Sequence, residues 1–242
     1  MPIVLAALQH LLKSGEKTSL VNQRTAACLS IQFFLTARQE EARRLLKSNV
    51  QLLHSGDLHF NFIYAKNNSD HENRSSILKS ISDLGSLNPV FIVQHYLSKL
   101  NALSLEHPLL FPKFKCVFTK GVRFTVIDSS LEPFSYDNCA KAYKSVYQEL
   151  HLDVDISTLT GTHAPRIGSA TEAVKSSKVN LFDLKHSGRW VSDKTPLQYL
   201  CQSTDSLSKV SEVLGTRLLE EQRKQSGQLV DQVISEALDG FV

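Results

Sequence analysis

Apolar residues recur at helical spacing along most of the chain, separated by short polar or glycine-bearing breaks. The first such stripe covers residues 3–13, and Thr18 and Ser19 can cap a second helix that runs through Phe34. Residues 38–46 form a third, short stripe with Glu40 and Glu41 early in it, where the helix dipole favours acidic residues. The same pattern predicts further helices at 89–101, 135–150, 164–177 and 179–187.

Alternation of apolar and polar residues marks a strand at 58–64, and residues 75–81 are expected to pair with it across a polar turn. Residues 105–134 contain prolines and are expected to be irregular. One or two amphipathic helices are expected within 205–238. The pattern therefore predicts an α+β fold that is mainly helical, with a small antiparallel β-sheet.

Composition and charge narrow the class of protein without identifying it. The chain has 242 residues, 42% of them hydrophobic, which is enough for a sizeable core, and a net charge of +3 that neither supports nor excludes DNA as a partner. Its cysteines show no zinc-binding spacing and are expected to be thiols of a reducing compartment. Neither a long apolar run nor a basic leader is present, so we expect an intracellular protein without a membrane partner. The cysteines are Cys28, Cys116, Cys139 and Cys201.

Three features between residues 161 and 199 stand in a fixed order. His163 and Arg166 form a His-x-x-Arg, a Gly-Arg-Trp ends at Trp190, and Tyr199 follows nine positions after the tryptophan. This order and spacing resemble the C-terminal active-site block of the tyrosine recombinases, the phage-integrase family of DNA strand-transfer enzymes.

Two upstream segments resemble the other parts of that family's active site. Arg38, followed three residues later by Glu41, matches the arginine of the first box, and Lys66 falls on the lysine of the family's β-hairpin. Residues 205–211 resemble the tail of eukaryotic, transposon-borne members. The resemblance covers residues 3–215, nearly the whole chain.

The resemblance implies a division of the chain and a set of partners. Residues 1–204 would be the catalytic domain and residues 205–242 an amphipathic helical tail, while the family's N-terminal core-binding domain is expected to be absent. The substrate would be double-stranded DNA, bound by a tetramer whose subunits pack through the tail. The location would be the nucleus if the host is eukaryotic.

The resemblance also implies a role for each matched residue. Arginine suits phosphate because its guanidinium stays charged and binds two oxygens at once. Tyrosine can form a covalent intermediate that stores the energy of the broken bond, so neither a metal nor a cofactor is expected. The implied catalytic residues are Arg38 and Arg166 on the phosphate, Lys66 as the acid, His163 in proton transfer, Trp190 in packing and in hydrogen bonding through its indole N–H, and Tyr199 as the nucleophile.

Each of these residues taken alone has an ordinary structural explanation. An Arg-x-x-Glu is usually a solvated helix face, a lone tryptophan is usually part of the core, and a tyrosine near a helix end is usually half-buried. The boxes also depart from the family pattern, with a polar first box and Ala-Pro after His163. Two alternatives stay open: an inactive DNA-binding or scaffold protein derived from a mobile element, and a type IB topoisomerase-like nicking domain. For the tail, packing on its own core is equally open.

Overall fold

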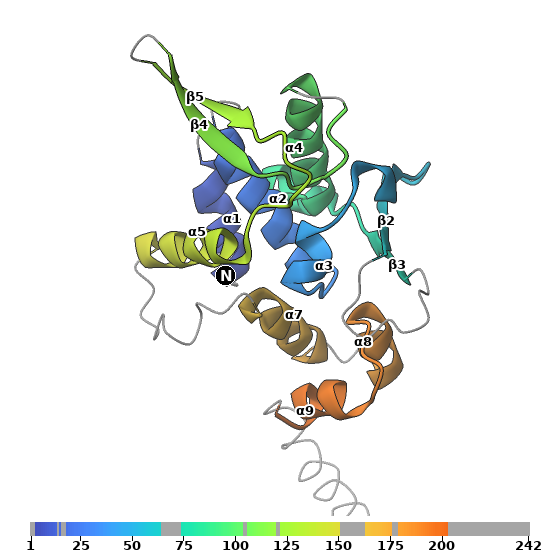
Figure 1. Ribbon diagram of the computed structural model, residues 1–242. Helices are drawn as coiled ribbons and strands as arrows, with labels where there is room; N and C mark the ends of the chain where they lie inside the picture. Colours follow the sequence, from blue (N-terminus) through green and yellow to red (C-terminus); the bar gives the residue numbers. More distant parts are fainter. Residues whose placement is uncertain are drawn as a thin grey trace, which may run out of the picture.

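The computed structural model describes residues 3–13, 15, 18–63, 74–103, 106–119, 122–150, 163–175 and 179–202. The helices within these ranges confirm the mainly helical fold that the pattern predicts (Figure 1). The helical elements are α1 (Ile3–Leu12), α2 (Leu20–Phe34), α3 (Gln39–Arg43), η2 (Lys47–Asn49), η3 (Ser82–Leu87), α4 (Pro89–Leu103), α5 (Tyr136–Glu149), α7 (Ala164–Lys175), α8 (Leu181–Ser187) and α9 (Lys194–Gln202). The strands are β1 (Val50–Leu52), β2 (Leu58–Phe62), β3 (Arg74–Leu78), β4 (Phe114–Thr119) and β5 (Val122–Ile127).

Helix α2 lies at the centre of the fold and packs against α1, α4 and α7 (Figure 1). The Ser19 side chain caps its start by accepting a hydrogen bond from the Asn22 N–H (3.2 Å). All residues from 23 to 32 are buried, polar ones included. Gln23, for example, donates from its side-chain amide to the Thr18 carbonyl (2.7 Å). A helix enclosed in this way shows little amphipathicity, because it has almost no solvent-facing side.

The three-stranded sheet has the order β1-β2-β3 and is antiparallel throughout. Leu58, Phe60 and Phe62 of β2 point into the core, which confirms the predicted alternation. Gly56 adopts a φ of 82° in the turn before β2, a conformation that side chains other than glycine rarely tolerate. Strand β3 occupies 74–78, so the predicted partner at 75–81 is correct in kind but ends too late.

Residues 114–119 and 122–127 form two antiparallel strands of a hairpin, so the expectation that 105–134 is irregular was wrong. Strands β4 and β5 pair from Phe114↔Ile127 to Thr119↔Val122 and project from the helical body (Figure 1). The two strands are rich in Val, Phe, Thr and Ile, a composition that favours β-structure. The prolines that suggested an irregular segment flank the hairpin instead.

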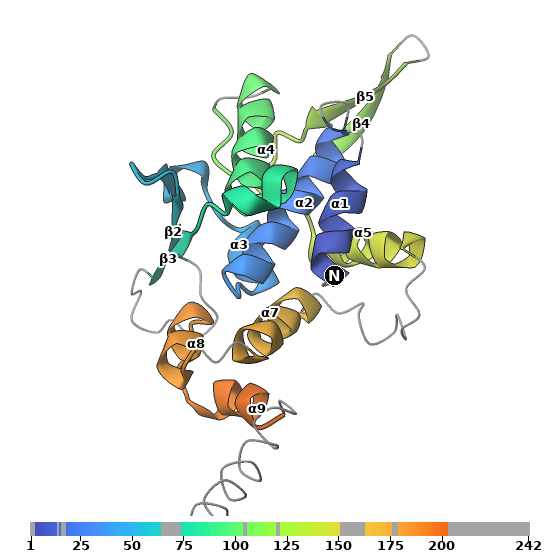
Figure 2. The ribbon, with the colours of Figure 1, turned by 180° about the vertical axis from the view of Figure 1, so that it is seen from behind.

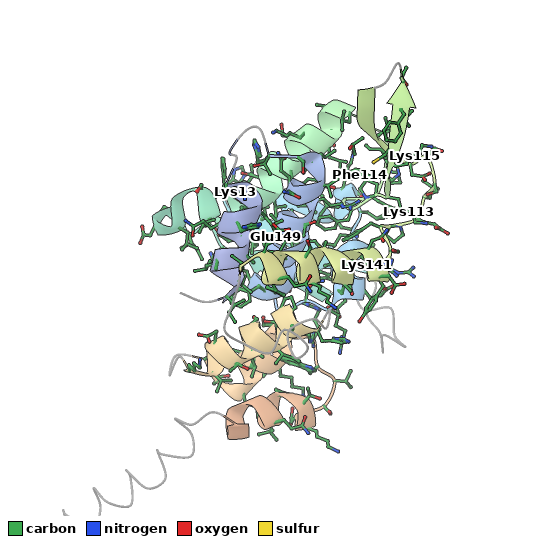
Figure 3. The ribbon with its side chains drawn as sticks, turned by 90° about the vertical axis from the view of Figure 1, so that its left-hand side faces the viewer. Lys13, Lys113, Phe114, Lys115, Lys141 and Glu149 are labelled. Carbon is green, nitrogen blue, oxygen red and sulfur yellow. The ribbon has the colours of Figure 1, made fainter. Side chains whose placement is uncertain are left out.

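A buried arginine anchors the base of this hairpin. The Arg24 guanidinium carbon lies 4.4 Å from the ring centroids of both Phe114 and Phe134, and its Nη1 donates to the Pro112 carbonyl (3.0 Å). Figure 3 shows Lys113, Phe114 and Lys115 at this end of the hairpin. The hairpin is therefore fixed to α2 at its base, while its strands extend away from the core.

Helices α7, α8 and α9 form a smaller unit beside the ends of α2 and α3 (Figures 1 and 2). Helix α7 packs against α2, and α9 packs against both α7 and α8. A small core of Ala170, Leu184 and Trp190 holds the unit together. The sequence pattern did not predict α9, and the expected tail at 205–242 lies outside the described residues. Within the described part of the chain, no helix is long and apolar enough to span a membrane.

Candidate active site

The turn between α2 and α3 places Arg38 and Glu41 beside each other. Thr36 has a φ of 49°, an unusual conformation for a β-branched residue, and the chain then reverses into α3. Arg38 is the N-cap of α3, and its backbone N–H donates to Glu41 Oε2 (2.8 Å). Arg38 Nη1 lies 2.8 Å from Glu41 Oε1, so the i,i+3 spacing seen in the sequence is a direct ion pair.

Arg166, from the start of α7, reaches the same carboxylate. Its Nη1 donates to the Thr36 carbonyl (2.7 Å) and lies 3.8 Å from Glu41 Oε2. Its Nη2 donates to the Gly188 carbonyl. The structure thus brings together the two arginines that the sequence proposed for phosphate binding, although one comes from near the start of the chain and the other from its last third.

A third arginine, Arg189, completes the group and was not among the residues predicted from the sequence. Its Nη2 lies 3.0 Å and its Nε 3.2 Å from Glu41 Oε2. It also donates from Nη1 to the Ser76 hydroxyl (2.9 Å) and from Nη2 to the Leu35 carbonyl (3.3 Å). The signal available in the sequence is its place inside Gly-Arg-Trp, where the resemblance to the family points to the tryptophan alone.

Trp190 supports Arg166 from one side. The Arg166 guanidinium carbon lies 4.4 Å from the centre of the Trp190 ring, within the range of a cation–π contact. Trp190 is buried, and its backbone N–H donates to the Lys185 carbonyl (3.1 Å) at the end of α8. The chain's only tryptophan therefore joins the small core of α7–α9 to the arginine cluster.

The cluster of three guanidiniums around one carboxylate carries a net positive charge. Burial alone would raise the pKa of Glu41, but the charges of Arg189, Arg38 and Arg166 and the Arg38 N–H lower it below its ordinary value. Glu41 is therefore ionised at neutral pH and compensates one of the three cations. Because the remaining positive charge is not balanced by Glu41, the cluster is suited to an anion such as a phosphodiester.

The other three predicted residues are His163, Tyr199 and Lys66, and only His163 has a described side chain. His163 is exposed in the turn before α7, and its carbonyl accepts from the Ile167 N–H (2.9 Å), so it lies about one turn ahead of Arg166. The backbone of Tyr199 belongs to α9, which packs on α7 and α8, but its side chain lies outside the described part. Lys66 lies outside the described residues altogether.

A metal would need a different arrangement of side chains. Among the residues that the structure describes, no three His, Cys, Asp or Glu side chains lie close enough together to hold an ion. The groups gathered at the site are arginines, which bind anions directly. The described part of the site therefore offers charge stabilisation through guanidinium groups.

Comparisons with known proteins bear on the fold. No protein-family model and no curated protein matches the chain. It is similar to the XerH site-specific recombinase bound to a palindromic difH substrate in a post-cleavage complex (TM-score 0.60, 16% identity, 88% of this chain and 52% of that one). A pre-cleavage complex of XerH with difH gives 0.56 and 16% over 81% and 47% of the two chains. The XerA recombinase gives 0.58 and 16% over 87% and 62%.

These likenesses establish the architecture. The chain has the fold of the tyrosine recombinase catalytic domain, mainly helical with small antiparallel sheets, as the sequence predicted. It spans from 47% to 62% of the length of the three recombinase chains. At 16% identity, the similarity shows a common fold. A fold does not by itself define an activity, which depends on the residues of the site.

Proposed function

We propose that this chain is the catalytic domain of a DNA strand-transfer enzyme that works through a covalent 3′-phosphotyrosine. One observation carries the proposal: Arg38 and Arg166 converge on Glu41 within a recombinase fold. Ordinary helix-surface arginines would pair with local acids and would not meet a residue more than a hundred positions away. Their convergence is what a site for one phosphodiester requires.

The proposed chemistry assigns a step to each residue. The Tyr199 hydroxyl oxygen attacks the scissile phosphorus, forming a P–O bond to the protein while the P–O5′ bond breaks. Arg38 and Arg166 stabilise the negative charge on the non-bridging oxygens. Lys66 protonates the departing 5′ oxygen, and His163 assists proton transfer. Attack by the 5′ hydroxyl of a second strand then reverses these bond changes and joins the new partner.

Trp190 has a packing role in this proposal. Its ring lies against the Arg166 guanidinium and holds that side chain at the start of α7. Catalysis by preorganised charges depends on such fixed positions, since each well-placed donor is worth on the order of 10²–10³ in rate. The tryptophan would therefore act by holding an arginine and not by reacting.

The partners follow from the same proposal. The XerH structures contain their difH DNA substrates, and this chain would bind double-stranded DNA across its arginine cluster. Strand exchange between two duplexes needs several active sites, so we propose a tetramer on DNA whose subunits contact each other through residues 205–242. Because arginine contacts to phosphates release counterions from DNA, affinity should fall as salt is raised.

The test is a panel of nicked duplexes of varied sequence, on which cleavage releases a short fragment and traps the covalent complex. The proposal predicts a protein–DNA adduct on a denaturing gel that Tyr199→Phe abolishes. DNA binding without any adduct would favour the inactive DNA-binding protein. Relaxation of supercoiled DNA by isolated monomers would favour a topoisomerase-like nicking domain.

A further inference from the structure

Arg189 is the most deeply buried of the three guanidiniums around Glu41. Its side chain is 2% exposed, compared with 6% for Arg166 and 20% for Arg38. The three side chains therefore form a series from the surface inward, and Arg189 lies at its inner end. At that depth Arg189 would support Arg38 and Arg166 and would not itself contact a substrate.

The contacts of Arg189 connect five separate elements. It binds Glu41 of α3, donates to Ser76 of β3 and to the Leu35 carbonyl at the end of α2, and itself follows α8. Its guanidinium carbon also lies 4.3 Å from the centre of the Phe62 ring of β2. A change at this residue would therefore alter the contacts between the sheet and the arginine cluster.

The backbone at Arg189 is left-handed, with a φ of 52°. Residues other than glycine adopt this conformation at an energetic cost, although asparagine tolerates it better than most. The turn sends two successive side chains to different partners, Arg189 to Glu41 and Trp190 to Arg166. One turn thus sets the positions of both supports of the cluster.

Of the three arginines around Glu41, Arg166 is the one that could bind this carboxylate more closely than it does. Its side chain is 1% exposed, and its Oε2 lies 3.0 Å from Arg189 Nη2 but 3.8 Å from Arg166 Nη1. A buried carboxylate attracts every nearby cation strongly, because water screens it little. If Arg189 were absent, Arg166 would be the cation best placed to move toward that oxygen, away from Trp190.

We infer that Arg189 is a positioning residue, which occupies Glu41 so that Arg166 stays stacked on Trp190 and Arg38 stays at the surface, both in place for a phosphate. The inference rests on the proposed function for the role of those two arginines. The structural part of the inference is that Arg189 fixes the position of Arg166. It does not depend on catalysis and can be tested by itself.

The chain offers a direct reporter of this position. Trp190 is the only tryptophan, so fluorescence excited selectively in tryptophan, beyond tyrosine absorption, arises from the ring on which Arg166 stacks. We would compare the folded wild type with Arg189→Asn, Arg189→Lys, Glu41→Gln and the double variant Glu41→Gln/Arg189→Asn. Asparagine keeps the left-handed backbone tolerable. Lys144→Asn, at an exposed position of α5, is the control for loss of one positive charge.

The expected result is a shift in Trp190 emission, or in its quenching by acrylamide, for Arg189→Asn and a smaller one for Arg189→Lys. Emission should return toward that of the wild type when Glu41→Gln is added, because the carboxylate no longer attracts Arg166. A purely structural role for Arg189 would give no recovery, since the second substitution removes yet another contact. Unchanged emission in folded Arg189→Asn, or no recovery in the double variant, would overturn the inference.

Covalent adduct formation supplies the second readout. Adduct formation by Arg189→Asn should be slower by about 10²-fold, the effect of a misplaced side chain near reacting atoms. The double variant should form adduct faster than Arg189→Asn alone. If the wild type forms no adduct on any duplex, the proposed function fails while the fluorescence comparison still decides whether Arg189 holds Arg166.

Discussion

The indole ring of Trp190 occupies the space that any side chain on Gly188 would need. A Cβ atom added to Gly188 would lie 2.1 Å from Cζ3 of that ring, far inside van der Waals contact. The backbone of Gly188 has an ordinary φ of −80°, so glycine is required here for space and not for conformation. The Gly-Arg-Trp of the sequence is thus a single packing unit in which the glycine admits the tryptophan that supports Arg166.

Gly188→Ala should therefore destabilise the protein, by roughly 1–3 kcal/mol as for other overpacked cores. Gly168→Ala is the matched control, because its nearest neighbour would be Phe33 Cε2 at 3.9 Å and alanine suits the interior of α7. That control should gain about 0.5–1 kcal/mol. Urea unfolding measures both, and equal stability of the two variants would contradict the packing described here.

Arg38 and Arg166 should respond differently to replacement by alanine. Each change should slow DNA cleavage by on the order of 10²–10³ if both arginines bind the phosphate. Arg166→Ala should also lower the free energy of unfolding by about 1–3 kcal/mol, because it leaves the buried carbonyls of Thr36 and Gly188 without their donor. Single-turnover cleavage and urea unfolding separate the two effects. Equal loss of stability in both variants would contradict the structural role given to the Arg166 hydrogen bonds.

The pH dependence of stability should depend on Asp57. Hydrogen bonds from Lys79 Nζ (2.7 Å), the Ser80 N–H (2.9 Å) and the Ser55 hydroxyl (2.8 Å) lower the pKa of Asp57 to about 2. A lowered folded-state pKa contributes stability above the unfolded pKa, near 4, and that stability is lost as the pH falls through about 2.

Asp57→Asn should accordingly be less stable than wild type at pH 7, with a difference that shrinks between about pH 4 and 2. Thermal unfolding across that range is the measurement. Asp83→Asn, at an exposed position of η3, is the control and should show a small effect at every pH. A difference for Asp57→Asn that stays constant down to pH 2 would show that its carboxylate is not held as described.

The cysteines should differ sharply in reactivity. Cys116 is exposed on β4, whereas Cys28 and Cys139 are fully buried. The hydrogen bond with Cys139, together with burial, raises the pKa of the Cys28 thiol and keeps it in the unreactive protonated form. In a Cys201→Ser background, Ellman's reagent should modify one thiol quickly and the other two only on unfolding. Rapid reaction of all three would mean that the interface between α2 and α5 is open.

Local sequence features predicted much of the fold because they act over a few residues. The Ser19 cap, the inward-facing Leu58, Phe60 and Phe62, and the helix over 136–149 all arise from such short-range patterns. The β4–β5 hairpin was not predicted because β4 is largely solvent-exposed. Its residues therefore show no alternation between core-facing apolar and solvent-facing polar side chains. Its anchor, Arg24 on α2, is remote in sequence.

Site residues that a characteristic sequence spacing marks could be predicted, whereas a site residue whose role depends on burial could not. Arg38, Glu41 and Arg166 followed from family-like spacing, and the structure brings them together. Arg189 could not be singled out, because its importance comes from a buried carboxylate 148 positions away and from a left-handed turn. Lys66 and the side chain of Tyr199 stay predictions of the sequence.

The central claim is that Tyr199 carries the DNA strand. The most direct measurement is mass spectrometry of the trapped complex after nuclease and trypsin digestion. The peptide of residues 195–209, which follows Lys194 and ends at Lys209, contains Tyr199 as its only tyrosine. We expect this peptide to carry a nucleotide joined through a 3′-phosphate to Tyr199. A nucleotide on any other tyrosine, or a cleaved substrate with no nucleotide on the protein, would contradict it.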